Sequence, residues 1–327
     1  MSSSNRQAPV KQKPKFSVAI TTTGYKNLIN NTLGDPNRAK RFIASITSAV
    51  AVNPALQDCE AGTILAGALL GESLNLSPSP QLGQYYLVPF DCKLKGPDGK
   101  TLWVRDKDGN KVTDDKGRWI AVTEKRAQFV LGFKGYIQMA LRSGQYVDLD
   151  VMEIREGEYL GKDPATGKPR FQFIEEDDLR DELPVIGYMA YFEYTNGFRK
   201  TIYWSKKKME KHADTYSPAY SAAAHERLRN GEIPDKDLWK YSSFWYKNFD
   251  DMAKKTLLRQ LISRWGVMST ELQQALTQDA SFASLGTGNE IVSIPEDQQD
   301  FMTPDEQPPI IRPEATDVVE NVNLDDL

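Results

Sequence analysis

Hydrophobic residues recur at helical spacing near the start of the chain. The segment 35–56 opens with Asp35, a good N-cap residue, and Pro36 stands at its first helical position. The segment 59–76 is apolar on almost every side, as is typical of a buried helix. Residues 1–15 are polar and basic with two prolines, so we expect a disordered arm there.

Strand-like alternation begins after a turn-rich break at 76–84. The segment 85–90 predicts a strand with Pro89 near its end. Between 93 and 126, three glycine-bearing turns separate strand-like segments with Trp103 and Trp119, which predicts a meander of hairpins.

A second group of strands follows in the middle of the chain. Residues 145–154 alternate as expected of a strand. Residues 184–204 predict two strands joined by Asn196-Gly197 in a type I′ turn. Helical spacing returns after Trp204 and ends with a long helix through 248–265.

The order of these elements predicts an α+β fold. An antiparallel sheet with hairpin excursions would pack on helices. We divide the chain into an arm at 1–34 available for oligomer contacts, a core at 35–270 and a flexible acidic tail at 271–327. Past about residue 280, prolines, glycines and acids replace the apolar pattern.

Charge is distributed unevenly along the 327 residues. The formal net charge is −4, but residues 290–327 hold eleven acids and one base, so the rest of the chain carries a net +6. The chain thus has a basic body and an acidic tail, a charge asymmetry that bears on its possible partners.

Composition also excludes several classes of protein. Two cysteines cannot form a disulfide framework, and the two histidines are not at a metal-site spacing. The first sixteen residues lack the apolar segment of a signal peptide, and no apolar run reaches membrane-spanning length. We therefore expect a soluble protein of a reducing compartment.

Enzyme signatures are weak. The Gly-Lys-Thr at 99–101 lacks the first glycine of a phosphate-binding loop, because residue 94 is Leu, so a hairpin turn is the better interpretation. His225 opens a segment without the second histidine of a zinc helix, and the acids at 175–178 fit a charged loop better than a nuclease metal site.

The segment 133–144 predicts a short amphipathic helix with an unusual polar face. Lys134, Gln138 and Arg142 form a line at i, i+4 spacing, and the segment contains no acid. Each step of about 6 Å along a helix comes close to the phosphate repeat of a nucleic-acid strand. The alternative is an ordinary solvated face.

Further bases gather near the helix predicted after residue 205. Ser205 is a plausible N-cap, which would put Lys206, Lys207 and Lys208 in the first turn, where cations oppose the helix dipole. They would suit an anion bound there, unless the helix begins later. Arg199 and Lys200 must point to opposite faces of the preceding strand, so only one of them can share this surface.

The long helix at 248–265 carries the last group of basic residues. Asp250–Lys254 and Asp251–Lys255 are good i, i+4 pairs, which indicates a stabilised surface helix. Arg259 has no such partner. The aromatic residues 244–246 before the helix fit either a base-stacking platform or the core.

Three segments in order resemble the RecT family of phage-encoded single-strand DNA annealing proteins. They are NLSPSPQLGQYYLVPF, FVLGFKGYIQMALRSG and FDDMAKKTLLRQLISRW, within a similarity that spans roughly residues 35–270. The resemblance implies ATP-independent annealing, assembly into rings or helical filaments, and a fold like that of a eukaryotic annealing domain. It also implies a phage exonuclease and a host single-strand binding protein as partners, and location in the bacterial cytoplasm.

The resemblance gives the basic residues a function. We expect them to contact single-stranded DNA and annealed duplex through phosphates, without a catalytic residue, a metal or a cofactor. The alternatives are a single-strand binding protein that does not anneal and, less favoured, a metal-dependent nuclease. The candidate DNA contacts are Lys93, Lys95, Arg126, Lys134, Gln138, Arg142, Arg199, Lys200, Lys206, Lys207, Lys208, Lys247, Lys255 and Arg259.

The acidic tail allows two interpretations. Its charge could make it compete with DNA for the basic body. The apolar Val318, Val319, Val322 and Leu324 favour a docking segment for a partner protein, since a purely electrostatic tail needs no apolar residues.

Overall fold

The computed structural model describes residues 15–96, 98–114, 117–217, 219–267, 269–279, 282–285 and 291–294, the last two as backbone only. Within these residues the fold is α+β with antiparallel strand pairs, as the sequence predicted. The predictions about the first fourteen residues and about residues 295–327 lie outside the described residues.

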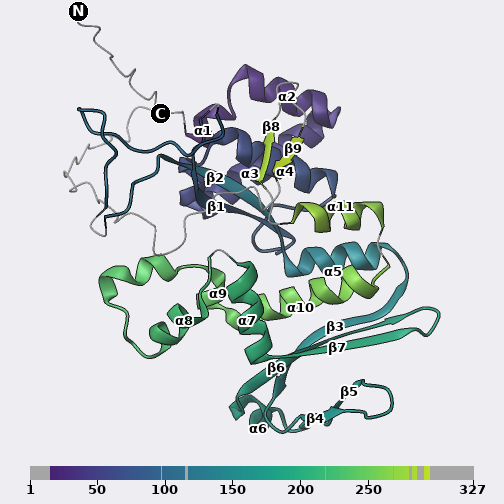
Figure 1. Ribbon diagram of the computed structural model, residues 1–327. Helices are drawn as coiled ribbons and strands as arrows, with labels where there is room; N and C mark the ends of the chain where they lie inside the picture. The colour runs from purple at the N-terminus through teal and green to yellow at the C-terminus, as the bar shows by residue number, and fades with distance from the viewer. Residues whose placement is uncertain are drawn as a thin grey trace, which may run out of the picture.

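The N-terminal half forms the upper part of the molecule in Figure 1. Helices α1 to α4 pack beside the antiparallel pair β1–β2, and α5 follows β2 directly. The bounds are α1 Phe16–Ala19, α2 Thr23–Leu33, α3 Pro36–Val52, the 3-10 helix η1 Pro54–Asp58, α4 Ala61–Ser73, β1 Tyr85–Lys93, β2 Thr123–Leu131 and α5 Phe133–Arg142.

The second half is built on a three-stranded sheet of order β3-β6-β7. Helices α10 and α7 pack on one face of it, and α10 also contacts α5, so these helices join the two halves (Figure 1). The strands are β3 Tyr146–Arg155, β4 Tyr159–Lys162, β5 Pro169–Phe171, β6 Val185–Tyr194, β7 Arg199–Ser205, β8 Phe282–Leu285 and β9 Ile291–Ile294. The helices are α6 Asp177–Glu182, α7 Lys206–Tyr216, α8 Ala222–Arg229, the 3-10 helix η2 Asp235–Tyr241, α9 Phe244–Lys247, α10 Phe249–Trp265 and α11 Thr270–Gln278.

Glycines allow α4 to lie directly on β1. A Cβ atom at Gly71 would stand 2.3 Å from the ring of Tyr85, and one at Gly67 would stand 2.8 Å from Leu87. The helix is buried on all sides through residue 71, as its apolar sequence predicted. Close packing of this kind explains why the helix tolerates glycine at positions 67 and 71, although each glycine costs about 1 kcal/mol of helix propensity.

Asn75 ends α4 and directs the chain toward β1. It adopts a left-handed conformation with φ 52°, which asparagine tolerates better than most residues. The Leu76 amide donates to the Gly71 carbonyl at 2.9 Å, and the Asn75 amide donates to Glu72 at 3.0 Å. This is a Schellman motif, and it fixes the start of the loop 75–84.

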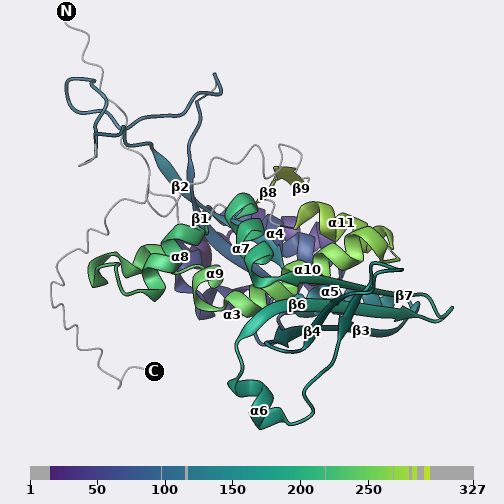
Figure 2. The ribbon, with the colours of Figure 1, turned by 60° about the horizontal axis from the view of Figure 1, so that its bottom comes forward.

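The region between β1 and β2 forms an arm that stands away from the body (Figure 2). Its three predicted turns are present, with Gly99, Gly109 and Gly117 all at positive φ. The described residues between these turns pair through isolated bridges rather than as the continuous strands that the sequence suggested. On the arm, the Lys111 ammonium lies 3.5 Å from the ring centroid of Trp119.

The turn between β6 and β7 corrects one prediction. A type I′ turn needs positive φ at both central residues, but only Gly197 has it, with φ 81°. The Gly197 amide donates to Tyr194 at 2.8 Å and the Tyr194 amide to Phe198 at 2.9 Å. This is a three-residue loop whose last residue is the left-handed glycine, so Asn196 keeps an ordinary conformation.

Ordered elements extend beyond the expected core boundaries. Phe16, Ile20 and Ile29, which lie within the predicted arm 1–34, are buried. On the C-terminal side, α11 lies within the predicted tail 271–327 for all but its first residue and buries Leu272 and Leu276. The amphipathic helices in both segments are short, so the polar composition of the neighbouring residues hides their helical pattern in the sequence.

Candidate nucleic-acid interface

Helix α5 presents the predicted polar line to solvent. Lys134 and Gln138 are exposed, while Tyr136 and Met139 on the opposite side are buried. Neither Lys134 nor Gln138 has a hydrogen-bond or ion-pair partner among the described residues. Gly132 and Gly135 bring the start of the helix against the loop, because a Cβ atom at either would come within about 2.1 Å of a backbone oxygen of Gly83 or Gln84.

Arg142 differs from the other two residues of the line. Its guanidinium donates from Nη1 to the Leu74 carbonyl at 2.7 Å and from Nη2 to the Asn75 carbonyl at 2.6 Å. These carbonyls belong to the turn that ends α4. Arg142 therefore holds the loop 75–84 against α5, in addition to any contact that its exposed side makes.

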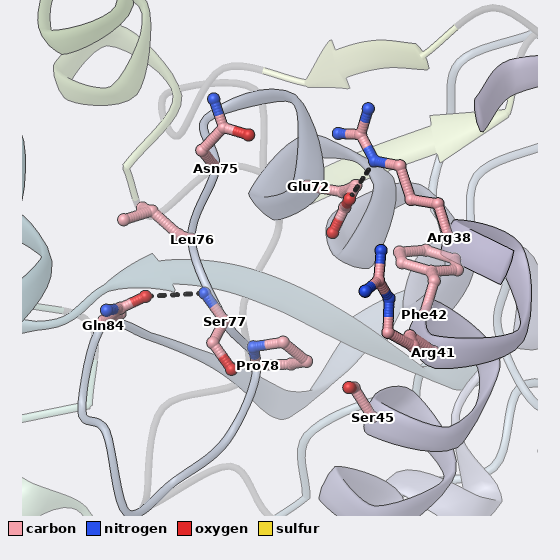
Figure 3. A pocket seen from close by; sticks show the side chains of 10 residues that line it. All are labelled: Arg38, Arg41, Phe42, Ser45, Glu72, Asn75, Leu76, Ser77, Pro78 and Gln84. Carbon is pink, nitrogen blue, oxygen red and sulfur yellow. Dashed lines mark hydrogen bonds and ion pairs between the residues drawn. The ribbon is translucent and has the colours of Figure 1, made fainter. Parts of the chain in front are cut away.

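A solvent-open hollow of about 340 Å³ lies on the other side of this loop (Figure 3). Arg38 and Arg41 of α3 reach it from one side, and the loop and Gln84 close the other. The Arg38 Nε donates to Glu72 at 2.6 Å. Arg41 points into the hollow without such a partner among the described residues.

A second basic surface lies around β7. Lys200 is on the sheet face that packs on α10, with its Nζ 3.8 Å from the ring centroid of Trp265. Arg199 points to the opposite face, where it pairs with Glu193 at 2.8 Å. Of these two candidates, Lys200 therefore shares the surface of the lysines that follow.

The three lysines at 206–208 do open helix α7. Ser205 is the N-cap, and its side chain accepts from the Lys208 amide. Lys206 lies 3.7 Å from Asp250, Lys207 is exposed, and the Lys208 Nζ lies 4.3 Å from the centroid of the Trp204 ring. The alternative of a later helix start is therefore wrong, and only Lys206 has an acidic partner among the described residues.

Two cations that the sequence did not single out lie close to Lys208. Partial burial, followed by the charges of Arg264 and Lys162, lowers the pKa of Lys208. Lys162 comes from β4 and Arg264 from the end of α10, and both are exposed. We call Lys162, Lys200, Lys208 and Arg264 the β7 cluster, and none of the four has an acidic partner within the described part of the chain.

His212 lies beside the β7 cluster. Its ring is 5.1 Å from that of Trp204 and 4.6 Å from that of the exposed Tyr216. Burial lowers its pKa below the ordinary value, and the charges of Arg259, Lys208 and Arg264 lower it further. The imidazole is therefore neutral at pH 7, surrounded by cations.

Lys255 and Arg259 on α10 are partly buried. Arg259 lies 3.6 Å from Asp279, a residue that also accepts hydrogen bonds from the Leu131 amide at 2.7 Å and from the Tyr136 hydroxyl. Burial lowers the pKa of Lys255, which Asp279 partly offsets. Arg259 has no acidic partner at i, i+4 spacing, as the sequence indicated, and pairs instead with Asp279, which lies twenty residues further along the chain.

The predicted surface pairs of α10 are also rearranged. Lys254 pairs with Asp251 at 3.1 Å and with Glu153 of β3 at 3.1 Å, and Asp250 accepts from the Tyr188 hydroxyl at 2.5 Å. The helix packs on the sheet, so its charged residues find partners there.

The remaining candidates are dispersed. Lys95 and Lys247 are exposed, Lys93 lies at the base of the arm, and Arg126 pairs with Glu124 at 3.1 Å. Of the aromatic residues before α10, Trp245 is buried in the core and Phe244 is 57% exposed. Among the described residues, no group of His, Cys, Asp and Glu could hold a metal ion, and no helix is long and apolar enough to cross a membrane.

Comparison with known proteins identifies related sequences. A sequence model of the RecT family matches residues 40–293. "Uncharacterized protein YqaK" of Bacillus subtilis (strain 168) is 32% identical over 242 residues, which are 74% of this chain and 64% of that protein. "Protein RecT" of Escherichia coli (strain K12) is 24% identical over 241 residues, which are 74% of this chain and 71% of that protein.

Proposed function

The chain belongs to the RecT family, and we propose that it binds single-stranded DNA and anneals complementary strands in homologous recombination. The observation that supports this most is the β7 cluster. None of its four cations has an acidic partner in the described structure; Lys208 interacts with Lys162, Arg264 and Trp204, and Lys200 lies on Trp265, the residue next to Arg264. Cations bind phosphates of any sequence, and aromatic rings stack on bases of any identity.

Annealing in this proposal needs no covalent chemistry. Cations hold the backbone of one strand, and its bases sample pairing with a second strand. Watson–Crick pairing supplies the specificity, so the protein contributes affinity for the backbone and an extended geometry. We propose that the reaction proceeds without ATP, metal or cofactor and that the protein has no catalytic residue.

The loop side of the molecule offers a second set of contacts. Lys134 and Gln138 on α5 have no partner in the described residues, and Arg41 lies on the opposite side of the loop 75–84. We propose that this surface and the β7 cluster both contact DNA. Lys93, Lys95, Arg126 and Lys247 remain proposed contacts at the arm and at α9.

The finer features of the proposal concern assembly and partners. We propose a homo-oligomer or helical filament that works in the bacterial cytoplasm with a phage exonuclease and a host single-strand binding protein. The division into arm, core and tail is also a proposal, with α1, α2 and α11 added to the core because their apolar residues are buried. The acidic tail would dock a partner.

A single assay tests the central proposal against its alternatives. Complementary labelled oligonucleotides are mixed with the protein without ATP, and both pairing and strand length are followed. Faster pairing at constant length supports annealing. Binding without faster pairing would instead indicate a protective single-strand binding protein, and shortening that requires a divalent metal would indicate a nuclease.

Charge-removing variants connect the assay to the β7 cluster. The double variant Lys208→Ala and Arg264→Ala should weaken binding and lower the log–log salt slope by about 0.7 for each lost phosphate contact on single strands. Arg229→Ala is the matched control, because Arg229 lies 3.7 Å from Glu210 and is already neutralised. An equal effect of both variants would contradict a special role for the β7 cluster.

A further inference from the structure

The hollow beside the loop 75–84 has an apolar floor and a polar rim. Phe42, Leu76 and Pro78 line it with buried side chains, and Arg41 and Gln84 lie at its edge. Its volume of about 340 Å³ is at the lower end of the range for small-molecule sites, about 300–1,000 Å³. A group of about the size of one nucleotide fits this space.

The polar groups at the rim are available. The Gln84 Oε1 accepts from the Ser77 amide at 2.7 Å, which orients the side chain and leaves its NH₂ group free to donate. The side chains of Ser45 and Asn75 have no hydrogen-bond partner among the described residues. Hydrogen-bond donors and hydrogen-bond acceptors therefore both surround the apolar floor of the hollow.

The charge of the hollow limits the ligand. Glu72 neutralises Arg38, with 2.6 Å between Oε1 and Nε, so Arg41 supplies the one unbalanced charge among the lining residues. One guanidinium matches the single negative charge of a phosphodiester. A polyphosphate or a dianionic ligand would have to approach the Glu72 carboxylate.

We propose that the hollow takes one unstacked nucleotide of the bound single strand. The base lies on Phe42 and Pro78, the backbone phosphate binds Arg41, and Ser45, Asn75 and Gln84 offer hydrogen bonds to the base edge. Because these groups include both donors and acceptors, they can accommodate any base. The inference rests on the proposed function and assigns a nucleotide position that the basic surfaces alone do not define.

Arg142 has a positioning role in this arrangement. Its bonds to the Leu74 and Asn75 carbonyls fix the loop from the α5 side, and the loop forms one wall of the hollow. A nucleotide anchored here would leave its neighbours unstacked and open to pairing. That geometry suits annealing better than a site that stacks every base.

The test uses a ratio of affinities. Binding is measured for an oligothymidine and for the same oligonucleotide with several bases replaced by abasic sites. Loss of a stacked base costs about fivefold or more in affinity, so the wild-type protein should prefer the intact strand. The hollow is then blocked, and the change in this preference is measured.

Chemical blocking avoids a folding defect. In the variant Ser45→Cys, the folded protein is labelled with the uncharged N-cyclohexylmaleimide. The two native cysteines are buried, and burial raises the pKa of the Cys59 thiol to about 12, so both react slowly. Lys40→Cys, labelled in the same way, is the control, because Lys40 is exposed on the same helix and does not line the hollow.

Labelling at position 45 should reduce the preference for the intact strand about fivefold or more, and labelling at position 40 should leave it unchanged. Arg41→Ala should weaken both oligonucleotides and lower the salt slope by about 0.7. The inference is overturned if the position-45 label leaves the ratio of the two affinities unchanged, whether or not the label weakens binding of both oligonucleotides. If the unlabelled protein neither binds nor anneals DNA, the proposed function itself fails.

Discussion

Lys134 and Arg142 lie on the same polar line of α5 but have different surroundings. Lys134 has no partner in the described structure, whereas Arg142 donates to two carbonyls of the α4 turn. The sequence places both on one face because helical periodicity determines direction. It does not reveal the carbonyls, which come from a turn 68 residues earlier in the chain.

Substitutions should separate these two residues. Lys134→Ala should weaken binding of unrelated DNA sequences equally, lower the salt slope by about 0.7, and leave thermal stability unchanged. Arg142→Lys keeps the charge but loses the two-pronged contact, so it should destabilise the fold by about 1–2 kcal/mol. Equilibrium binding and thermal unfolding measure the two effects. A fully stable Arg142→Lys protein would contradict the positioning role.

His212 should make DNA binding depend on pH. Its pKa is below the ordinary 6.5 because of burial and the charges of Arg259, Lys208 and Arg264, so it becomes charged only as the pH falls below that value. Bound phosphates favour the charged form, so affinity should rise several-fold between pH 7.5 and 5.5.

The variant His212→Gln should lose part of this pH dependence, measured at constant ionic strength. The folding stability of the DNA-free protein should change in the opposite direction and decrease as the pH falls. A depressed pKa in the folded state contributes stability above pH 6.5 that is lost as the pH falls. Equal pH dependence of binding in the two proteins would exclude His212 as the titrating group.

At the scale of elements, Glu158 anchors the segment that carries Lys162. Its carboxylate is fully buried and accepts from Arg180 Nε at 2.6 Å and from the Arg155 amide at 2.7 Å. Burial alone would raise its pKa, but the bonds from Arg180 and from the backbone lower it below 4.5. The stabilisation is therefore present above pH 4.5 and is lost as the pH falls through the folded-state pKa.

Glu158→Gln should loosen α6 and the β4–β5 hairpin, because it leaves Arg180 without its buried partner, at a cost of about 3–5 kcal/mol. Hydrogen exchange at Tyr159–Lys162 should accelerate, and less stability should be lost below pH 4.5. Glu156→Gln at the exposed neighbouring position is the control. Unchanged exchange in the Glu158 variant would show that the hairpin is held by other contacts.

The arm between β1 and β2 permits a test by deletion. The Leu94 amide donates to the Val122 carbonyl at 2.8 Å, so an Asn-Gly turn can join these two residues in place of 95–121. We expect the β1–β2 pair to persist. Annealing should fall, because the deletion removes the exposed Trp119 and the basic residues of the arm. Sedimentation distinguishes a loss of DNA contact from a loss of protomer contact. Normal annealing by the shortened protein would show that the arm is dispensable.

Element types were largely predictable, but contacts between elements were not. The N-cap at Asp35, the buried α4, the glycine turns of the arm and the lysine-rich start of α7 follow local rules of capping and periodicity. Lys162 and Arg264 belong to separate elements, so no sequence spacing connects them to Lys208. The hollow also escaped prediction, because it depends on how α3 faces the loop.

At the scale of the whole molecule, charge asymmetry leads to the last prediction. Residues 295–327 hold ten acids and one base, so their deletion changes the formal net charge from −4 to +5. This boundary keeps β9, which pairs with β8 beside α4. If the tail competes with DNA, deletion should raise affinity a few-fold, mostly at low salt where screening is weak.

We expect docking to be the larger effect. Replacing Val318, Val319, Val322 and Leu324 with Ser should leave DNA affinity and annealing in vitro unchanged and reduce recombination in cells. Replacing the ten acids with their amides should reproduce the gain in affinity of the deletion, because that gain depends on charge and not on the apolar residues. If either variant abolished annealing by the purified protein, the tail would instead have to take part in the fold or in the assembly of the annealing complex.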